Sequence, residues 1–284
     1  MARISSRFAV GLAVVAALGL GGCATPAPTG PAAVAPRVDP AALAAPPAAA
    51  RAAPGATPAA PGVSPGAAPA GPASPAAPDA KTASTGLPAG VAAPPAGTNQ
   101  LVTVLTPSAS SGSGELRGWK RGADGRWAGA VGPVRVRVGT DGVGTASERV
   151  NRTPRGTFAL PSAFGRQPNP GTRMPYRKVG TSDWWVSDPR SPAYNTYRHC
   201  TPGSCGFDES AGENLGQAGA SYDYALVIGY NTGPVRKGAG SAFFVHVDAG
   251  AASQGCVEVP RATQLALLRW LDPAQRPRIT IGLG

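Results

Sequence analysis

The sequence predicts a mainly β fold for residues 99–284, and three observations support this prediction. Short apolar or alternating runs recur between clusters of glycine, serine, asparagine and aspartate. One segment near the C-terminus has the leucine spacing of a helix. The five tryptophans and six tyrosines all lie after residue 98, so the large side chains needed for a core belong to one C-terminal domain.

Seven strands and one helix are expected. The strands are Gln100–Thr106, Glu115–Lys120, Val134–Val138, Tyr224–Tyr230, Ala242–Val247, Val257–Val259 and Arg278–Leu283. Pro260 opens the helix at 261–271, and Asp272 and Pro273 close it. The stretch 161–213 is rich in proline, glycine and aromatic residues and has little periodicity. A loop of this length inside a domain predicts a functional segment or a lid.

The first 22 residues have the pattern of a signal peptide. Arg3 and Arg7 precede the apolar run Phe8–Leu20, which is too short to span a bilayer comfortably. The sequence Leu-Gly-Gly-Cys ending at Cys23 resembles the bacterial lipoprotein box. It predicts acylation of Cys23, so that the mature protein is extracytoplasmic and held at the membrane by lipid. A plain cleaved signal peptide is the alternative.

Residues 23–98 are predicted to be a disordered linker. Between Ala24 and Thr98 there are 29 alanines, 18 prolines and no aromatic residue. Such a segment has too little large apolar surface to offset the entropy of ordering. It is either a tether that lets the domain reach through a cell wall or a passive spacer, and the composition does not separate the two.

The formal net charge of +11 indicates that the protein would bind anionic partners. A basic surface attracts nucleic acid, but export argues against nucleic acid as a partner and favours anionic wall polymers as the counter-charge. The charge is also consistent with a role in solubility alone. We expect a monomer.

The cysteines divide into three roles. With Cys23 lipidated, three cysteines remain in an oxidising compartment, so one is unpaired. Cys200 and Cys205 enclose the turn-forming sequence Thr-Pro-Gly-Ser and are expected to form a disulfide. A metal cluster of these two with His199 is the alternative, although the spacing is not a standard zinc spacing. Cys256 remains as a free, reactive thiol.

His246 and Cys256 are the candidate catalytic pair. Alternation along the two predicted strands places both side chains on the face opposite the core. The connection 248–255 fits a hairpin loop, which would set imidazole and thiol side by side. An imidazole can hold a thiol as the nucleophilic thiolate, and the backbone N–H groups of Gly255 and Cys256 are candidate oxyanion donors. Alternatively, His246 is a surface histidine and Cys256 a small buried residue.

Two motifs in order along the chain carry a family resemblance. The sequence Ser-Gln-Gly-Cys-Val at 253–257, preceded by His246, resembles the active-site signature of the YkuD-type L,D-transpeptidases. The sequence Thr-Pro-Arg-Gly-Thr-Phe at 153–158 is similar to the TPxGxF element of that family. The resemblance covers roughly residues 100–284. It implies a β-sandwich-like catalytic domain with a few short helices and with no metal or organic cofactor.

The resemblance also implies roles for individual residues. Cys256 would be the nucleophile, His246 its base, and the Ser253 carbonyl the group that orients the imidazole. The residues expected at the substrate are Gln254, Tyr176, Trp184 and Trp185, and packing near the core is the alternative role for the three aromatic residues. This chain has Gln254 where many relatives have a second histidine, and Glu258 where arginine or asparagine is common. The ten-residue separation of His246 and Cys256 is shorter than in many relatives.

The reaction implied is acyl transfer between peptidoglycan stem peptides. A tetrapeptide stem would lose its terminal D-alanine, and a neighbouring amine would take the acyl group in a 3→3 cross-link. Two alternatives remain open from the sequence. Water could resolve the thioester, which would make the protein an L,D-carboxypeptidase or another hydrolase of stem peptides. The chain could also be a wall-binding lipoprotein without turnover.

Overall fold

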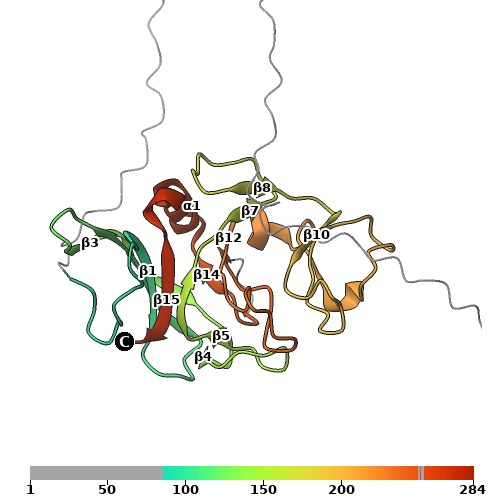
Figure 1. The fold of residues 1–284 in the computed structure, drawn as a ribbon, viewed down its shortest axis with the longest axis horizontal. Helices are drawn as coiled ribbons and strands as arrows, with labels where there is room; N and C mark the ends of the chain where they lie inside the picture. Colours follow the sequence, from blue (N-terminus) through green and yellow to red (C-terminus); the bar gives the residue numbers. More distant parts are fainter. Residues whose placement is uncertain (1–85, 249, 251–252) are drawn as a thin grey trace, which may run out of the picture. The chain divides into compact units, whose positions relative to one another are not determined.

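Ten strands form one curled sheet in the computed structural model, which describes residues 86–248, 250 and 253–284. Figure 1 shows the arrangement. The order across the sheet is β6 (Gly156–Ala159), β15 (Arg278–Leu283), β1 (Gln100–Thr106), β2 (Ser113–Arg121), β3 (Trp127–Arg137), β14 (Val257–Val259), β13 (Phe244–Val247), β12 (Ala225–Val227), β7 (Ala163–Gly165) and β8 (Tyr176–Lys178). The predicted mainly β class is confirmed.

Several smaller elements lie between the strands of the large sheet along the chain. One small sheet contains β10 (Tyr197–His199), β9 (Asp183–Trp185) and β11 (Glu213–Asn214), and another contains β4 (Val143–Gly144) and β5 (Thr153–Pro154). The described residues also form the 3₁₀ turns η2 (Glu209–Ala211), η3 (Gly219–Asp223) and η4 (Pro273–Gln275). The α-helix α1 spans Arg261–Trp270 and begins after Pro260, as predicted.

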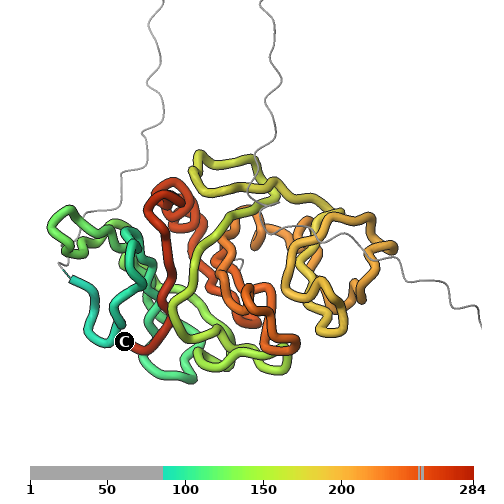
Figure 2. The backbone as a smooth tube through the Cα atoms, in the orientation of Figure 1, coloured from blue at the N-terminus to red at the C-terminus, as the bar shows by residue number. Residues whose placement is uncertain are grey.

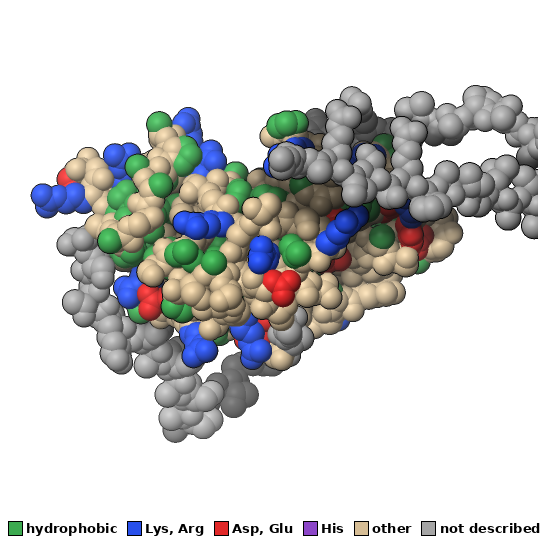
Figure 3. All heavy atoms as spheres, turned by 90° about the horizontal axis from the view of Figure 1, so that it is seen from below, with side chains coloured by type: hydrophobic (Ala, Val, Ile, Leu, Met, Phe, Trp, Pro, Cys, Tyr) green, Lys and Arg blue, Asp and Glu red, His purple; other side chains and the backbone are tan. Residues whose placement is uncertain are grey.

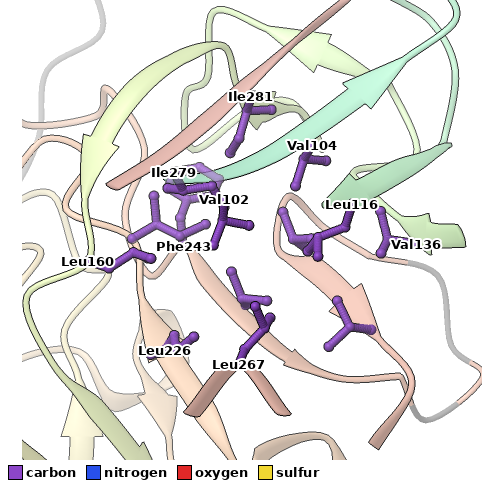
Figure 4. Packing of buried hydrophobic residues seen from close by; sticks show 14 of the residues in the cluster. Val102, Val104, Leu116, Val136, Leu160, Leu226, Phe243, Leu267, Ile279 and Ile281 are labelled. Atoms are coloured by element: carbon purple, nitrogen blue, oxygen red, sulfur yellow. The ribbon is translucent and has the colours of Figure 1, made fainter. Parts of the chain in front are cut away.

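The large sheet has a hydrophobic cluster on each face near β12, β13 and β14. The aliphatic cluster lies within the curl and is drawn in Figure 4. Its buried members are Val102, Val104, Leu116, Val136, Val138, Val143, Ala146, Leu160, Ala163, Met174, Leu226, Ile228, Phe243, Val245, Val257, Val259, Leu267, Leu268, Leu271, Ile279 and Ile281. The Gly229 N–H donates to the Ala159 carbonyl at 2.9 Å, which ties the segment after β12 to the edge strand β6.

The opposite face carries the aromatic cluster. Its buried members are Phe164, Val179, Trp185, Tyr197, Leu215, Tyr222, Ala225, Val227, Ala242 and Phe244. Neighbouring residues alternate between the clusters, as Leu226 between Ala225 and Val227 shows. Much of the cluster comes from residues 164–222, which follow one another from β7 through β9 and β10 to η3 and are coloured from yellow-green to orange in Figure 2. The segment predicted to be functional or a lid therefore covers this face.

Two structural expectations are corrected. β13 and β14 pair in parallel, with Val245 opposite Val257, so the predicted hairpin is wrong. Parallel neighbours usually need a connection of a dozen or more residues. Here β13 spans about 13 Å at ~3.3 Å per residue, so the shorter connection can return along it. The strand predicted at Tyr224–Tyr230 is shortened to β12, because the Gly229 and Ile228 amides bond to two different segments.

Residues 86–98, assigned to the linker from composition, contact the domain. The Gly86 N–H donates to the Trp127 carbonyl at 2.7 Å, and Thr98 is buried. The predicted signal peptide, Cys23 and the linker up to residue 85 lie outside the described residues. Within the described part of the chain, no helix is long and apolar enough to cross a membrane.

Candidate active site

The backbone before β14 holds Cys256 in a fixed turn. The Ser253 hydroxyl accepts a hydrogen bond from the Gly255 N–H at 3.0 Å and donates to the Cys256 carbonyl at 2.7 Å. Gly255 has φ +143°, and a Cβ there would lie 2.6 Å from the Phe243 ring. Position 255 therefore requires glycine. Because the Gly255 N–H bonds to Ser253, the Cys256 N–H is the better oxyanion candidate of the two.

The Thr-Pro-Arg-Gly-Thr-Phe segment at 153–158 supports this turn through hydrogen bonds at its first residue. The Thr153 hydroxyl accepts from the Gly139 N–H at 2.8 Å, and Gly139 forms a parallel bridge with Ser253. The next residue along, Thr140, donates its N–H to the Ser253 carbonyl at 3.1 Å. The two motifs found in the sequence are therefore structurally linked.

The thiol of Cys256 is partly buried and lies against the start of β13. It donates to the Ala242 carbonyl at 3.4 Å and accepts from the Phe244 N–H at 3.4 Å. Since Phe244 and His246 share one face of β13, Cys256 and His246 lie on the same side of the sheet. This side is the aromatic face, so the expectation that both side chains point outward is corrected: residues 164–222 bury them.

The imidazole of His246 is buried, with 6% of the residue exposed. Its Nδ1 lies 3.0 Å from the Val247 carbonyl, which only accepts, so this contact assigns the proton to Nδ1 and leaves Nε2 to act as base. The predicted orienting group was the Ser253 carbonyl, and this prediction is wrong: that carbonyl accepts from Thr140 instead. The carbonyl of Val247, the residue after the histidine, orients the imidazole instead.

Electrostatics favour the neutral forms of both groups. Burial lowers the pKa of His246, and the Val247 carbonyl and Asp248 act in the opposite direction. Burial also raises the pKa of the Cys256 thiol, and the carboxylates of Glu213 and Glu258 raise it further. The expected resting thiolate is therefore not supported. Proton transfer to His246 would accompany attack on a substrate.

A cavity of about 290 Å³ opens beside Cys256. Gln254, Gly255 and Cys256 line it, so Gln254 lies where a substrate residue is expected. The other lining residues are Ser147, Glu148, Val150, Asn151, Ser187, Ser210, Ala211, Gly212, Glu213, Ser241, Ala242 and Phe243. A larger cavity of about 940 Å³ lies against β2 and β3 and contains none of the predicted catalytic residues. The smaller cavity is the candidate site because it contains the thiol.

The three aromatic residues predicted at the substrate do not line this cavity. Trp185 packs edge-on against Phe244 with ring centroids 5.2 Å apart, and its Nε1–H donates to Asn195 at 2.9 Å. Trp184 packs against Phe207. The Tyr176 hydroxyl donates to the Gln167 carbonyl at 2.8 Å. All three residues stabilise the chain that covers the aromatic face.

Sequence reasoning missed Glu213, Tyr222 and Asn195. Asn195 is buried at φ 56° and accepts from the N–H of Ala242, whose carbonyl accepts from the thiol. Tyr222 contacts His246 edge-on, with ring centroids 5.2 Å apart. These three residues lie far along the chain from both motifs, and their residue types alone do not indicate a place in the active site.

The predicted disulfide between Cys200 and Cys205 is confirmed, with a Cα–Cα distance of 5.2 Å. The alternative metal cluster is wrong, because both sulfurs are covalently paired and His199 contacts Asp183 at 3.0 Å. Across the described ranges, no group of three or more histidine, cysteine, aspartate or glutamate side chains is arranged to hold a metal. Lysine and arginine side chains are scattered over the face drawn in Figure 3.

Comparison with known proteins decides the family. Residues 120–281 match the model of the YkuD L,D-transpeptidase catalytic domain. The chain belongs to the YkuD family. Members are cysteine-dependent transpeptidases that act on peptidoglycan stem peptides, which agrees with a thiol in the cavity. Searches of curated proteins and of solved structures found no match.

Proposed function

We propose that this YkuD protein is a peptidoglycan L,D-transpeptidase that forms 3→3 cross-links. The observation that carries the proposal is the placement of Cys256 in a cavity, on the same face as an imidazole whose Nε2 is left to accept a proton. A thiol with an adjacent base and a fixed orienting group is the arrangement used for covalent acyl transfer.

The first half-reaction forms the acyl-enzyme. The Cys256 sulfur attacks the carbonyl carbon of the third residue in a tetrapeptide stem as the thiol proton moves to His246 Nε2. The C–N bond then breaks, and the proton passes to the nitrogen of the departing D-alanine. The Cys256 N–H is the candidate donor to the tetrahedral oxyanion.

The second half-reaction transfers the acyl group. The amine of a neighbouring stem attacks the thioester carbonyl, the C–S bond breaks, and the amine proton returns through His246 to the sulfur. Neither step needs an added oxidant or a cofactor. Hydrolysis by water in place of the amine would give a tripeptide stem.

The test uses the full chain in detergent, a Cys256→Ala variant, and purified disaccharide-tetrapeptide, with products read by mass spectrometry. We expect loss of D-alanine and a cross-linked dimer from the intact protein and neither from the variant. Tripeptide without dimer would change the assignment to carboxypeptidase. No product from a folded protein would favour the wall-binding alternative, and equal product from both would exclude Cys256 as nucleophile.

Export and lipid anchoring are part of the proposal. The lipoprotein-like sequence ending at Cys23 supports the anchor, and the disulfide at Cys200 fits an oxidising compartment. The basic composition fits anionic wall polymers. Membrane fractionation of cells producing the Cys23→Ala chain tests the anchor: the variant should leave the membrane fraction, and its retention there would contradict lipidation.

A further inference from the structure

Tyr222 contacts both members of the catalytic pair. It lies in η3, is buried, and its ring meets the His246 ring edge-on with centroids 5.2 Å apart. The same ring packs edge-on against Phe244 and Phe164, at 5.6 and 5.5 Å. These contacts fix the ring, so its hydroxyl has one direction in which to point.

The Tyr222 hydroxyl lies between the thiol and the half-buried carboxylate of Glu213. It donates its one proton to Glu213 Oε2, and its oxygen also interacts with the Cys256 thiol. Glu213 belongs to β11, which pairs with Trp185 on β9, and its side chain lines the cavity that contains Cys256. The carboxylate therefore reaches the site from the chain that covers the aromatic face.

The two groups act on the thiol in opposite directions. The Glu213 carboxylate raises the pKa of Cys256, whereas a hydrogen bond from the Tyr222 hydroxyl to the sulfur lowers it. The hydroxyl has one proton, so it can make this bond only when that proton turns from Glu213 to the sulfur. Burial raises the pKa of Glu213 itself to about 7, and Glu148 across the cavity adds to this effect. The other charged groups near the pair are Glu258, which faces the thiol, and Asp248, which faces His246.

We propose that Glu213 and Tyr222 form a positioning pair for the nucleophile, in which the carboxylate holds the tyrosine proton away from the sulfur so that the thiol keeps its own proton until a substrate is attacked. This inference rests on the proposed function for its biological meaning. A protonated thiol reacts slowly with oxidants and alkylating agents. By holding the tyrosine proton, Glu213 would therefore protect Cys256 in an oxidising compartment while leaving the thiol proton for His246.

The test measures iodoacetamide labelling of Cys256 against pH, by mass spectrometry on the full chain in detergent. Glu213→Gln removes the charge and keeps an acceptor for Tyr222, so the labelling midpoint should move to lower pH. Tyr222→Phe removes the hydroxyl and should move the midpoint to higher pH. At a fixed pH below the midpoint, the labelling rate should change roughly tenfold for every pH unit by which the midpoint moves. Midpoints that move in opposite directions distinguish this role from general loosening, which would move both variants the same way.

Tyr194→Phe is the matched control, since the Tyr194 hydroxyl also donates to a cavity-lining carboxylate, that of Glu148. Its labelling midpoint should stay at the wild-type value. Equal midpoints in Glu213→Gln, Tyr222→Phe and wild type would overturn the proposal. So would a wild-type midpoint below that of an ordinary thiol, a result that needs no variant to fold. Because labelling uses no peptidoglycan, failure here is separable from failure of the transpeptidase assay.

Discussion

The two faces of the sheet at β12, β13 and β14 bury different chemistry. The aliphatic cluster on one face is built mainly from hydrocarbon side chains, including the fully buried Leu226 and Leu267. The aromatic face holds rings that hydrogen-bond, together with His246 and the partly buried Cys256. Apolar burial on the first face stabilises the fold without constraining a reaction. The second face buries polar groups at a cost in free energy and thereby shifts their pKa values.

The largest expected effect is on the aliphatic face. Leu226→Ala removes a fully buried side chain, and we expect the free energy of unfolding to fall by about 2–5 kcal/mol. Urea denaturation measures the loss. In the folded fraction, the pH midpoint of Cys256 labelling should not change, because Leu226 points away from the thiol. A shifted midpoint would show that the two faces are coupled.

A smaller loss is expected from Asn195→Asp on the aromatic face. Asn195 donates to the carbonyls of Tyr230 and Asn231 at 3.1 and 2.9 Å, and a carboxylate cannot donate to them. Leaving buried acceptors unpaired should cost about 1–3 kcal/mol. Because Asn195 also holds Ala242, labelling of Cys256 should change together with stability. Loss of stability with unaltered labelling would mean that Asn195 supports the fold alone.

The smallest effect is expected at the disulfide. Cys200 and Cys205 close a loop with a sequence separation of 5. Restricting so short a loop in the unfolded chain contributes at most about 2 kcal/mol. The double variant Cys200→Ser/Cys205→Ser should show a modest decrease in Tm by calorimetry and wild-type labelling of Cys256. Accelerated labelling in this variant would instead indicate that the loop helps to cover the thiol.

Local signals in the sequence predicted several elements and the face of the sheet on which Cys256 and His246 lie. The observed bounds of β1, β14 and β15 are those predicted, because each is a short run of strand-forming residues between breakers. Pro260 gave the start of α1. The alternation of residues placed Cys256 and His246 on one face, and the family motifs agreed with it.

The remaining features depend on contacts between distant segments. Neither the parallel pairing of β13 and β14 nor the position of Glu213 follows from spacing, since both are decided by how the chain folds back on the sheet. The same reason explains the wrong assignment of Trp184 and Trp185. Conspicuous aromatic residues attract a functional interpretation, yet Trp184 packs on Phe207 and Trp185 on Phe244, so both stabilise the segment that covers the active site.

The parallel pairing of β13 and β14 also limits how the loop between them can change. The chain leaves β13 after Val247, and Cys256 lies beside Phe244 at the other end of that strand, so the connection between them has a minimum length set by this distance. Insertions would add slack at little entropic cost, since closure entropy grows slowly with length. Deletions would pull Cys256 toward the C-terminal end of β13 and out of its place beside Phe244. We therefore expect evolution to tolerate insertions in this loop and to eliminate deletions.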